Sequence, residues 1–403
     1  MGERFERARQ LDERYHLPTY ARKPVMFVRG EGMRLYDDEG REYLDFVSGI
    51  GVVSLGHSHP AVVEAVREQV GALTHVSNLY YVEHRSELAQ ELSQLAGGDM
   101  KVFFCNSGAE ASEGAIKLAR KWASTHKAPG ARTVISALRS FHGRTLAALA
   151  ATGQPGKQEA FQPLPGGFVH VELNDIAALE AAIDESVCAV MLEPVQGEGG
   201  VYPCDHDYLR AVRQLCDERG VLLVFDEVQC GLYRTGPAFA HMAAGVRPDI
   251  MTVAKALANG LPIGAVLARG EAAQAFAPGD HGSTFAGGPV VCAAARATLK
   301  AMAAERVGEN SERVGSYLRA GLEELASRTG AICEVRGVGL MVAAELVRPD
   351  AAQLAEKALE AGIVVNNIGT HTIRFLPPLV CSEAEIDTLL TQLHPLLAAG
   401  EDT

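Results

Sequence analysis

Short apolar runs alternate with longer segments of helical periodicity from about residue 60 onward. The longer segments, such as Ala109–Trp122 and Tyr208–Glu218, have apolar positions that recur at helical spacing. Repeated strand–helix–strand order with continuous apolar strands predicts a mostly parallel sheet covered by helices on both faces. The predicted strands are Val102–Cys105, Thr133–Ala137, Phe168–Val171, Ala189–Leu192, Val221–Asp226, Ile250–Ala254 and Ile263–Ala268.

The two ends of the chain have a different pattern. Near the N-terminus, Val25–Val28, Arg34–Tyr36 and Tyr43–Phe46 predict an antiparallel meander, with turns at Gly30/Gly32 and residues 38–40. After residue 290 the chain becomes helical and then mixes helices with strands. We therefore predict an α/β fold with a large domain at residues 51–290 and a smaller α+β domain built from residues 1–50 and 291–403. The predicted C-terminal strands are Ala331–Val335, Met341–Glu345, Val364–Asn366 and Thr372–Phe375.

The charge of the chain narrows the choice of partners. Of 403 residues, 50 are acidic and 37 are lysine or arginine, giving a net charge of −13. This balance argues against nucleic acid or an anionic membrane, because both require a basic surface. No apolar run reaches the ~20 residues of a membrane span, and the charged N-terminus does not resemble a signal peptide. The eight scattered cysteines are typical of reduced thiols, so a cytoplasmic protein is expected.

No metal site is predicted from the spacing of histidines and cysteines. His57 and His59 flank a turn before a helix, but no partner ligands lie at the spacing of a zinc site. A structural role for both histidines is the more common outcome.

Two strand ends carry the residues with the clearest chemistry. The strand ending at Asp226 places a carboxylate where open α/β sheets bind their ligands, although a helix cap is an equally common role for such an acid. Lys255 closes another apolar strand, and a lysine there is either a solvated end residue or a Schiff-base former. Together the two residues favour a cofactor site, because pyridoxal phosphate needs an acid for its ring nitrogen and a lysine for its aldehyde.

A phosphate site is predicted where Cys105–Glu110 follows a strand and opens a helix. Gly108 and Ala109 leave backbone N–H groups accessible at a helix N-terminus, which favours an anion. Ser107 and Glu110 also fit the S-x-x-E capping box, which often occurs without any ligand. The loop at residues 282–289 is a second, weaker candidate for a phosphate contact.

Charged and aromatic residues in three further segments are candidates for substrate contacts. Phe141 could stack on a planar ring and Arg144 could bind a carboxylate, although ordinary loop packing is as common. Arg374 lies inside an apolar strand, where an arginine usually has an anionic partner. Glu193 and Glu198 are strand-end acids that could supply that partner.

The chain resembles the class III, or ornithine-type, aminotransferases of pyridoxal-phosphate fold type I over about residues 18–395. N-acetylornithine aminotransferases are the most similar subgroup, with succinylornithine and ornithine aminotransferases as neighbours. The resemblance rests on the segments beginning at Gly56, Asn106, Phe141, Glu193, Phe225, Ala254, Val335 and Arg374, which follow in family order and spacing.

The resemblance implies the transfer of a terminal amino group from N-acetylornithine, or a similar ω-amino acid, to 2-oxoglutarate in arginine biosynthesis. It implies Lys255 as Schiff-base lysine and proton shuttle, Asp226 on the ring nitrogen and Gln229 on the phenolic oxygen. The cofactor would be pyridoxal 5'-phosphate, and the enzyme a homodimer with shared active sites. The other implied cofactor contacts are Ser107, Gly108 and Ala109 with Thr284 of a second subunit on the phosphate, Val228 and Phe141 on the ring, and Glu193.

The resemblance also implies how two different amino donors use one site. Arg374 would bind the α-carboxylate of glutamate or 2-oxoglutarate, and Arg144 a second substrate carboxylate. We hypothesise that Glu198 pairs with Arg374 while the ω-amine donor is bound and releases it for glutamate, since an uncompensated buried arginine is costly. The chain departs from the family pattern at Ala286, Gly288 and Tyr233, which affects the interface loop and the substrate subtype.

The sequence leaves three alternative functions to consider. A racemase, decarboxylase or mutase would use the same lysine, acid and phosphate loop. A nucleotide-binding ATPase would explain the apolar residues before Asp226 and Glu227, but its G-x-x-x-x-G-K-[ST] loop does not occur. Intact Lys255 and Asp226 argue against a binding protein without catalysis.

Overall fold

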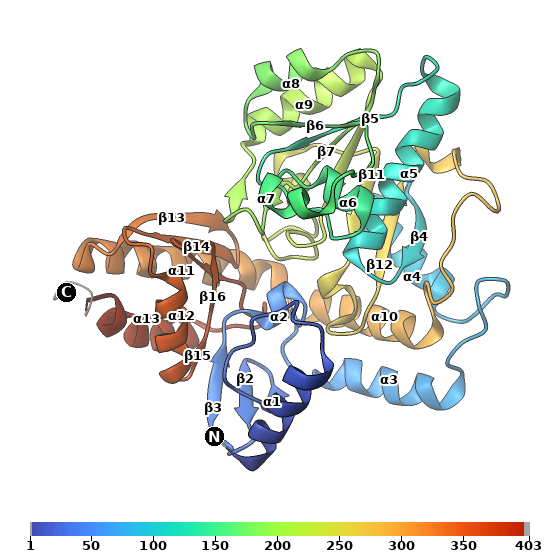
Figure 1. Cartoon of the computed structure of the whole chain (residues 1–403). Coiled ribbons are helices and arrows are strands. Elements are labelled where there is room, and N and C mark those ends of the chain that lie inside the picture. Colours follow the sequence, from blue (N-terminus) through green and yellow to red (C-terminus); the bar gives the residue numbers. More distant parts are fainter. Residues whose placement is uncertain (1, 399–403) are drawn as a thin grey trace.

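A computed structural model describes residues 2–398 and has a seven-stranded sheet at its centre (Figure 1). The strand order is β4-β12-β11-β10-β7-β5-β6. All neighbouring pairs are parallel except those of β12, which runs antiparallel to both β11 and β4. The strands are β4 (Lys101–Cys105), β5 (Thr133–Ala137), β6 (Phe168–Val171), β7 (Val187–Leu192), β10 (Leu222–Asp226), β11 (Ile250–Val253) and β12 (Gly264–Ala268). The predicted α/β fold with a mostly parallel sheet is confirmed.

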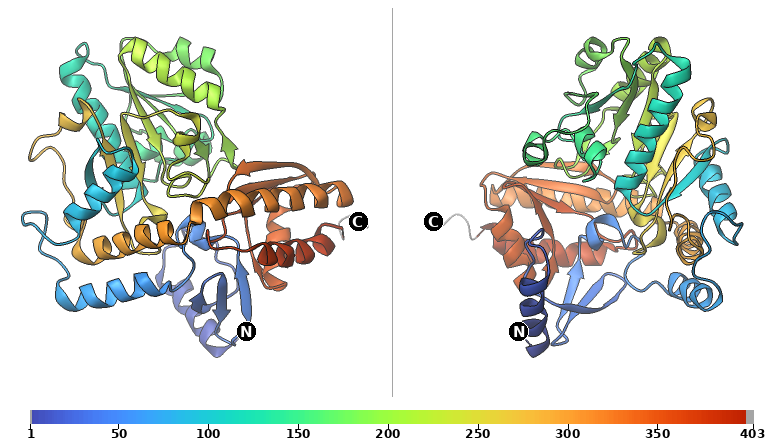
Figure 2. Two further views of the ribbon diagram at one scale, coloured as in Figure 1. Left: turned by 180° about the vertical axis from the view of Figure 1, so that it is seen from behind. Right: turned by 45° about the vertical axis from the view of Figure 1, so that its right-hand side comes forward.

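Helices cover both faces of this sheet (Figures 1 and 2). Along β10, Leu222 and Val224 share a core with the apolar side of α5, whereas Leu223 and Phe225 pack on the opposite face with α8 and α9. Burial on both faces explains why the strands are apolar at every position rather than at alternate ones. The helices and turns around the sheet are α5 (Gly108–His126), α6 (Leu146–Ala151), α7 (Pro155–Gln158), η1 (Glu159–Phe161), α8 (Ile176–Ala182), α9 (His206–Arg219), η2 (Ala240–Ala244), η3 (Lys255–Ala258) and η4 (Ala272–Gln274).

The C-terminal part forms a second sheet packed on long helices. Its strand order is β13-β14-β17-β16, and α11 lies against β13 and β14. The strands are β13 (Ile332–Val338), β14 (Met341–Leu346), β16 (Asn366–Ile368) and β17 (Thr372–Phe375). The helices are α10 (Pro289–Ala304), α11 (Val307–Thr329), α12 (Ala351–Glu360) and α13 (Glu383–Ala398), while α3 (Pro60–Ala72) and α4 (Arg85–Leu95) pack against α10.

The N-terminal meander is completed by a strand from the other end of the chain. The sheet order is β1-β2-β3-β15, and β15 runs parallel to β3 with Ile363 opposite Leu44. The Leu44 N–H donates to the Gly362 carbonyl at 2.9 Å. This pairing supports the grouping of the two ends, although the domain limits stay a prediction. The elements are α1 (Glu3–Tyr15), β1 (Phe27–Glu31), β2 (Arg34–Asp37), β3 (Glu42–Asp45), α2 (Ser48–Gly51) and β15 (Ile363–Val364).

The first meander strand and the two histidines after the meander differ in how well they match the sequence predictions. The first meander strand begins at Phe27 rather than Val25, so Gly30 lies within the strand and the turn is at Gly32. His57 bonds Asp45 and His59 bonds Glu305, each at 2.8 Å. Within residues 2–398 there is no group of three metal-ligating side chains, and no helix is both long and apolar enough to cross a membrane.

Candidate active site

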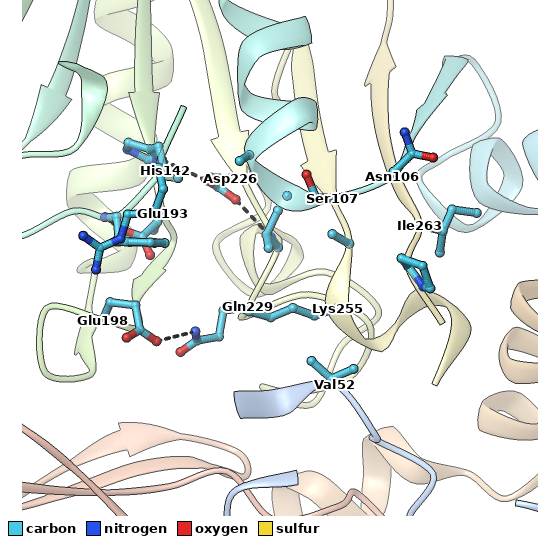
Figure 3. Close-up of a pocket in the computed structure, with 18 of the residues that line it drawn as sticks. Val52, Asn106, Ser107, His142, Glu193, Glu198, Asp226, Gln229, Lys255 and Ile263 are labelled. Atoms are coloured by element: carbon cyan, nitrogen blue, oxygen red, sulfur yellow. Dashed lines mark hydrogen bonds and ion pairs between the residues drawn. The ribbon is translucent and has the colours of Figure 1, made fainter. Parts of the chain in front are cut away.

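The carboxyl ends of five strands of the seven-stranded sheet meet at one cavity of about 410 Å³ (Figure 3). This is the edge at which open α/β sheets bind ligands. The chain places most of its candidate residues there, directly after β4, β5, β7, β10 and β11. Those that line the cavity are Ser107, Gly108, Ala109, Phe141, Arg144, Glu193, Glu198, Asp226, Val228, Gln229 and Lys255. Arg374, on β17, bonds two of these residues, Glu198 and Gln229, and Thr284 lies outside the cavity lining.

Asp226 is a buried carboxylate with three hydrogen-bond partners. Its Oδ2 lies 2.8 Å from His142 Nδ1, and its Oδ1 accepts from Thr252 Oγ1 at 3.0 Å and from the Val228 N–H at 3.1 Å. Burial alone lowers the pKa of His142, but the hydrogen bond and charge of Asp226 outweigh burial and raise it. Asp226 is therefore held in one orientation, beside an imidazole whose pKa it raises.

His142 and Thr252 are contacts that the sequence analysis missed. His142 stood between two candidates, Phe141 and Arg144, and received no role. Thr252 lies directly opposite Asp226 in the register of β10 and β11. Strand pairing was the signal that could have found Thr252, because parallel neighbours place their last residues side by side.

Lys255 follows β11 in a constrained backbone conformation. Its φ is +42°, a region that non-glycine residues rarely adopt and that clusters at functional sites. The half-buried side chain lines the cavity, and within residues 2–398 its amine makes no hydrogen bond or ion pair. Burial lowers the pKa of Lys255, against the opposing influence of Glu198. An unbonded amine with a lowered pKa is suited to attack a carbonyl carbon.

The start of α5 forms the opposite wall of the cavity. Ser107 caps the helix by accepting from the Glu110 N–H at 3.2 Å. The expected capping box is incomplete, because the Glu110 carboxylate accepts from the N–H of Asn106 at 3.0 Å rather than from Ser107. The first-turn N–H groups of Gly108 and Ala109 have no acceptor within the helix. A Cβ at Gly108 would come 2.8 Å from a methyl carbon of Val228, so a larger residue there would force Val228 to move.

The glycine-rich loop at residues 282–289 reaches this wall through one contact. Asn106 Nδ2 donates to Ser283 Oγ at 2.8 Å. Thr284 is exposed and does not line the cavity of its own chain. Its predicted role toward the phosphate of a second subunit stays a prediction.

Glu198, Gln229 and Arg374 form a hydrogen-bonded cluster at the other end of the cavity (Figure 3 shows Glu198 and Gln229). The fully buried Arg374 donates to Glu198 Oε1 at 2.5 Å and to Gln229 Oε1 at 3.1 Å, and Gln229 Nε2 donates to Glu198 at 3.1 Å. Burial raises the pKa of Glu198, but the charges of Arg374 and Lys255 outweigh it and hold the pKa at about 2. Glu198 is thus the ionised partner of Arg374.

Glu193 lies in a different environment, although it belongs to the same segment. Its buried carboxyl accepts from the N–H of Phe141 at 2.9 Å and of Gly197 at 3.2 Å, and it makes no contact with Arg374. Burial raises its pKa to about 7. Glu193 therefore orders the backbone around Phe141, whose ring lies 5.5 Å from the Arg144 guanidinium.

The family model of the aminotransferases of class III matches residues 17–397 of the chain. The chain belongs to the class III aminotransferase family. An acetylornithine aminotransferase of Caldanaerobacter subterraneus subsp. tengcongensis is 49% identical over 387 residues, covering 96% of this chain and 98% of that protein. An acetylornithine aminotransferase of Thermosynechococcus vestitus is 50% identical over 393 residues, covering 95% of each chain.

Solved structures of class III aminotransferases share the fold. The ornithine aminotransferase of Toxoplasma gondii ME49 superposes with a TM-score of 0.94 at 34% identity, covering 99% of this chain and 96% of that one. The acetylornithine aminotransferase of Elizabethkingia anophelis gives a TM-score of 0.88 at 35% identity, covering 98% and 99%. The family depends on pyridoxal phosphate, and this chain is a pyridoxal-phosphate-dependent aminotransferase.

The cavity fits this cofactor by its own chemistry. A buried carboxylate for the ring nitrogen, an unbonded amine for the aldehyde and a free helix N-terminus for the phosphate line the same cavity. A Cβ at Gly108 would crowd Val228 at this helix N-terminus. These three groups are the ones that pyridoxal phosphate needs from a protein.

Proposed function

We propose that the protein transfers the terminal amino group of N-acetylornithine to 2-oxoglutarate, giving a semialdehyde and glutamate in arginine biosynthesis. The observation that carries this proposal is the Glu198–Arg374 ion pair at the end of the cavity that also holds Lys255. A covered arginine suits a donor that has no carboxylate on its reacting carbon. The similarity to acetylornithine aminotransferases that are 49% and 50% identical supports the acetylated donor.

The proposed cofactor contacts follow from the walls of the cavity. Ser107, Gly108 and Ala109 would bind the phosphate, Phe141 and Val228 would enclose the ring, and Gln229 would bond its phenolic oxygen. Asp226 would keep the ring nitrogen protonated, with His142 holding the carboxylate in place. When bound, pyridoxal phosphate supplies the aldehyde that accepts the amino group and the ring that accepts electrons.

Lys255 is proposed to carry out the proton transfers. Its amine would hold the cofactor covalently and, when free, would take a proton from the reacting carbon. A lowered pKa leaves a larger fraction of this amine neutral, which a general base requires.

The exchange of donors is proposed to run through Glu198. With N-acetylornithine bound, Glu198 neutralises Arg374 and the chain of the substrate passes beside the pair. With glutamate bound, its α-carboxylate replaces Glu198 on Arg374, and Gln229, which bonds both residues, steadies the exchange. Arg374 is thus paired with a carboxylate in both half-reactions, and Glu198, once released, keeps the hydrogen bond from Gln229.

A homodimer with shared active sites is part of the proposal. Leu79, Tyr80, Tyr81 and Phe285 are between 66% and 101% exposed, and Phe285 is next to Thr284. An apolar surface of this kind beside a predicted intersubunit contact is typical of an interface. Light scattering of the purified protein would test it, with a monomer contradicting the shared site. We propose a cytoplasmic location.

The decisive experiment is an absorbance spectrum with matched donors. Purified protein should be yellow, lose its visible band on adding N-acetylornithine and regain it with 2-oxoglutarate. Succinylornithine and ornithine are the comparison donors at equal concentration. Faster bleaching by either of them would reassign the donor, while loss of carbon dioxide or racemisation without amino transfer would overturn the proposal.

A further inference from the structure

We propose that Lys157 is a specificity-determining residue, which forms with Arg144 a two-cation subsite for the substrate carboxylate farthest from the reacting carbon. The inference rests on the proposed function and adds a residue to it. Lys157 lies on α7, which begins at Pro155. No motif in the sequence marked it, because a lone lysine in a short turn is usually solvated.

Lys157 is held next to the cavity by a fixed amide. Its amine donates to Gln154 Oε1, and Gln154 Nε2 donates in turn to the carbonyls of Ser140 at 3.0 Å and Arg139 at 3.3 Å. These carbonyls directly precede Phe141 in the chain. The amine therefore lies 5.7 Å from the centre of the Phe141 ring, and the side chain is half-buried.

Arg144 approaches the same ring from its own loop. Its guanidinium carbon lies 5.5 Å from the ring centre of Phe141, and both Phe141 and Arg144 line the cavity. Two cations thus share one aromatic ring at the cavity wall. Among residues 2–398, neither has a carboxylate partner: Arg144 makes no hydrogen bond or ion pair, and Lys157 bonds only the neutral Gln154.

Unpaired neighbouring cations need an explanation in this chain. Acidic residues outnumber lysine and arginine by 50 to 37, and the other arginine at the cavity, Arg374, is paired. Burial and the charge of Arg144 lower the pKa of Lys157 and outweigh the opposing charge of Glu198, so the two cations repel each other. An anion between them would remove this repulsion and bond both groups.

The chemistry of the proposed substrates identifies that anion as a carboxylate. N-acetylornithine reacts at its terminal carbon and carries its carboxylate at the other end of the chain. Glutamate reacts at its α-carbon and carries its second carboxylate one carbon–carbon bond nearer. Two flexible cations that share the end of the site can follow this difference in reach, whereas one fixed fork fits a single length. The phosphate wall at Ser107–Ala109 is a separate anion site.

The test compares donors that differ only in the distant carboxylate. N-acetylornithine is matched with N-acetylputrescine, which lacks the carboxylate, and glutamate with glutamine, which has a neutral amide in its place. For Lys157→Ala, kcat/KM should fall about fivefold to tenfold for each carboxylate donor and stay within about twofold for its neutral match. Lys157→Arg should restore most of the loss. Lys357→Ala, an exposed lysine on α12, is the control and should change neither ratio.

The outcomes separate this inference from the proposed function. Equal losses for charged and neutral donors, or unchanged ratios in Lys157→Ala, would overturn the two-cation subsite and leave the proposed function standing. If the unmodified enzyme does not accept N-acetylornithine, the proposed donor is wrong, and the glutamate and glutamine pair still decides the role of Lys157.

Discussion

Two glutamates of one segment, Glu193 and Glu198, have opposite electrostatic environments. Both follow β7 and line the same cavity, yet the pKa is about 7 for Glu193 and about 2 for Glu198. Glu193 is buried against backbone N–H groups, whereas Glu198 is held by two cations, Arg374 and Lys255. The comparison shows that partner type rather than position along the strand determines the charge state of a cavity acid.

The difference divides the cavity into two ends. At the cofactor end, Glu193 and Asp226 have backbone and fixed side-chain partners, which no substrate can replace. At the substrate end, Glu198 bonds a guanidinium that a substrate carboxylate can bind equally well. The first end is suited to holding one cofactor throughout, and the second to exchanging donors in each turnover.

The largest expected effect is at Lys255, which stands between the two ends. Lys255→Ala should lower turnover by at least about 10⁴-fold, because covalent attachment and proton transfer both depend on its amine. Steady-state kinetics and the visible spectrum are the measurements. Retained visible absorption of the unmodified kind would contradict the assignment of this lysine.

The next largest loss of activity is expected at the cofactor end. Asp226→Asn should lower kcat by about 10²–10³-fold in both half-reactions, because the charge on the ring nitrogen is lost. Thr252→Val is the matched control: it removes one of the carboxylate's hydrogen bonds but leaves its charge, and should cost less than about tenfold. Equal losses in the two variants would show that orientation rather than charge is the function of Asp226.

At the cofactor end, Glu193 should also make the stability of the protein depend on pH. The pKa of Glu193 is raised in the folded state from an ordinary value of 4.5 to about 7, so ionisation favours the unfolded chain as pH rises through this window. Relative to Glu193→Gln, the native protein should lose about 3 kcal/mol of unfolding free energy between pH 4.5 and 7. Denaturant unfolding at several pH values measures this. Exposed Glu172→Gln should keep the native slope, and a Glu193→Gln variant that does so as well would contradict the prediction.

The smallest change in rate among these variants is expected at the substrate end. Glu198→Ala should slow the N-acetylornithine half-reaction about tenfold relative to the glutamate half-reaction, because Arg374 then stays uncovered beside the ω-amine donor. Stopped-flow measurement of the two half-reactions gives this ratio directly. Glu198→Gln keeps the size and removes the charge, so it should behave like the alanine variant. An unchanged ratio in both would disprove the exchange.

The sequence predicted the strands and most of the cavity for a physical reason. Buried strands are continuous apolar runs, and residues at their carboxyl ends converge whatever lies between them, as Asp226 and Lys255 illustrate. Contacts that depend on strand register or on loop conformation were not predictable in this way. Thr252 became a partner of Asp226 through pairing of β10 and β11, and Lys157 reached Phe141 through the Gln154 amide.

Backbone conformation was another part that the sequence left open. Tyr233, noted as a departure from the family pattern, has a φ of +69°, a region that favours glycine. Its ring packs against Gly308, where a Cβ would come 3.0 Å from the ring. Packing against Gly308 thus holds Tyr233 in this strained backbone conformation, at a site away from the cavity lining.

The pairing of β3 with β15 has a consequence for synthesis on the ribosome. The N-terminal meander emerges first, but the strand that completes its sheet emerges only after most of the chain has been made. Until then one strand edge of the nascent chain has open hydrogen-bonding groups, a state that invites wrong pairing and chaperone binding. A part of this enzyme that is translated early is therefore among the last to be finished.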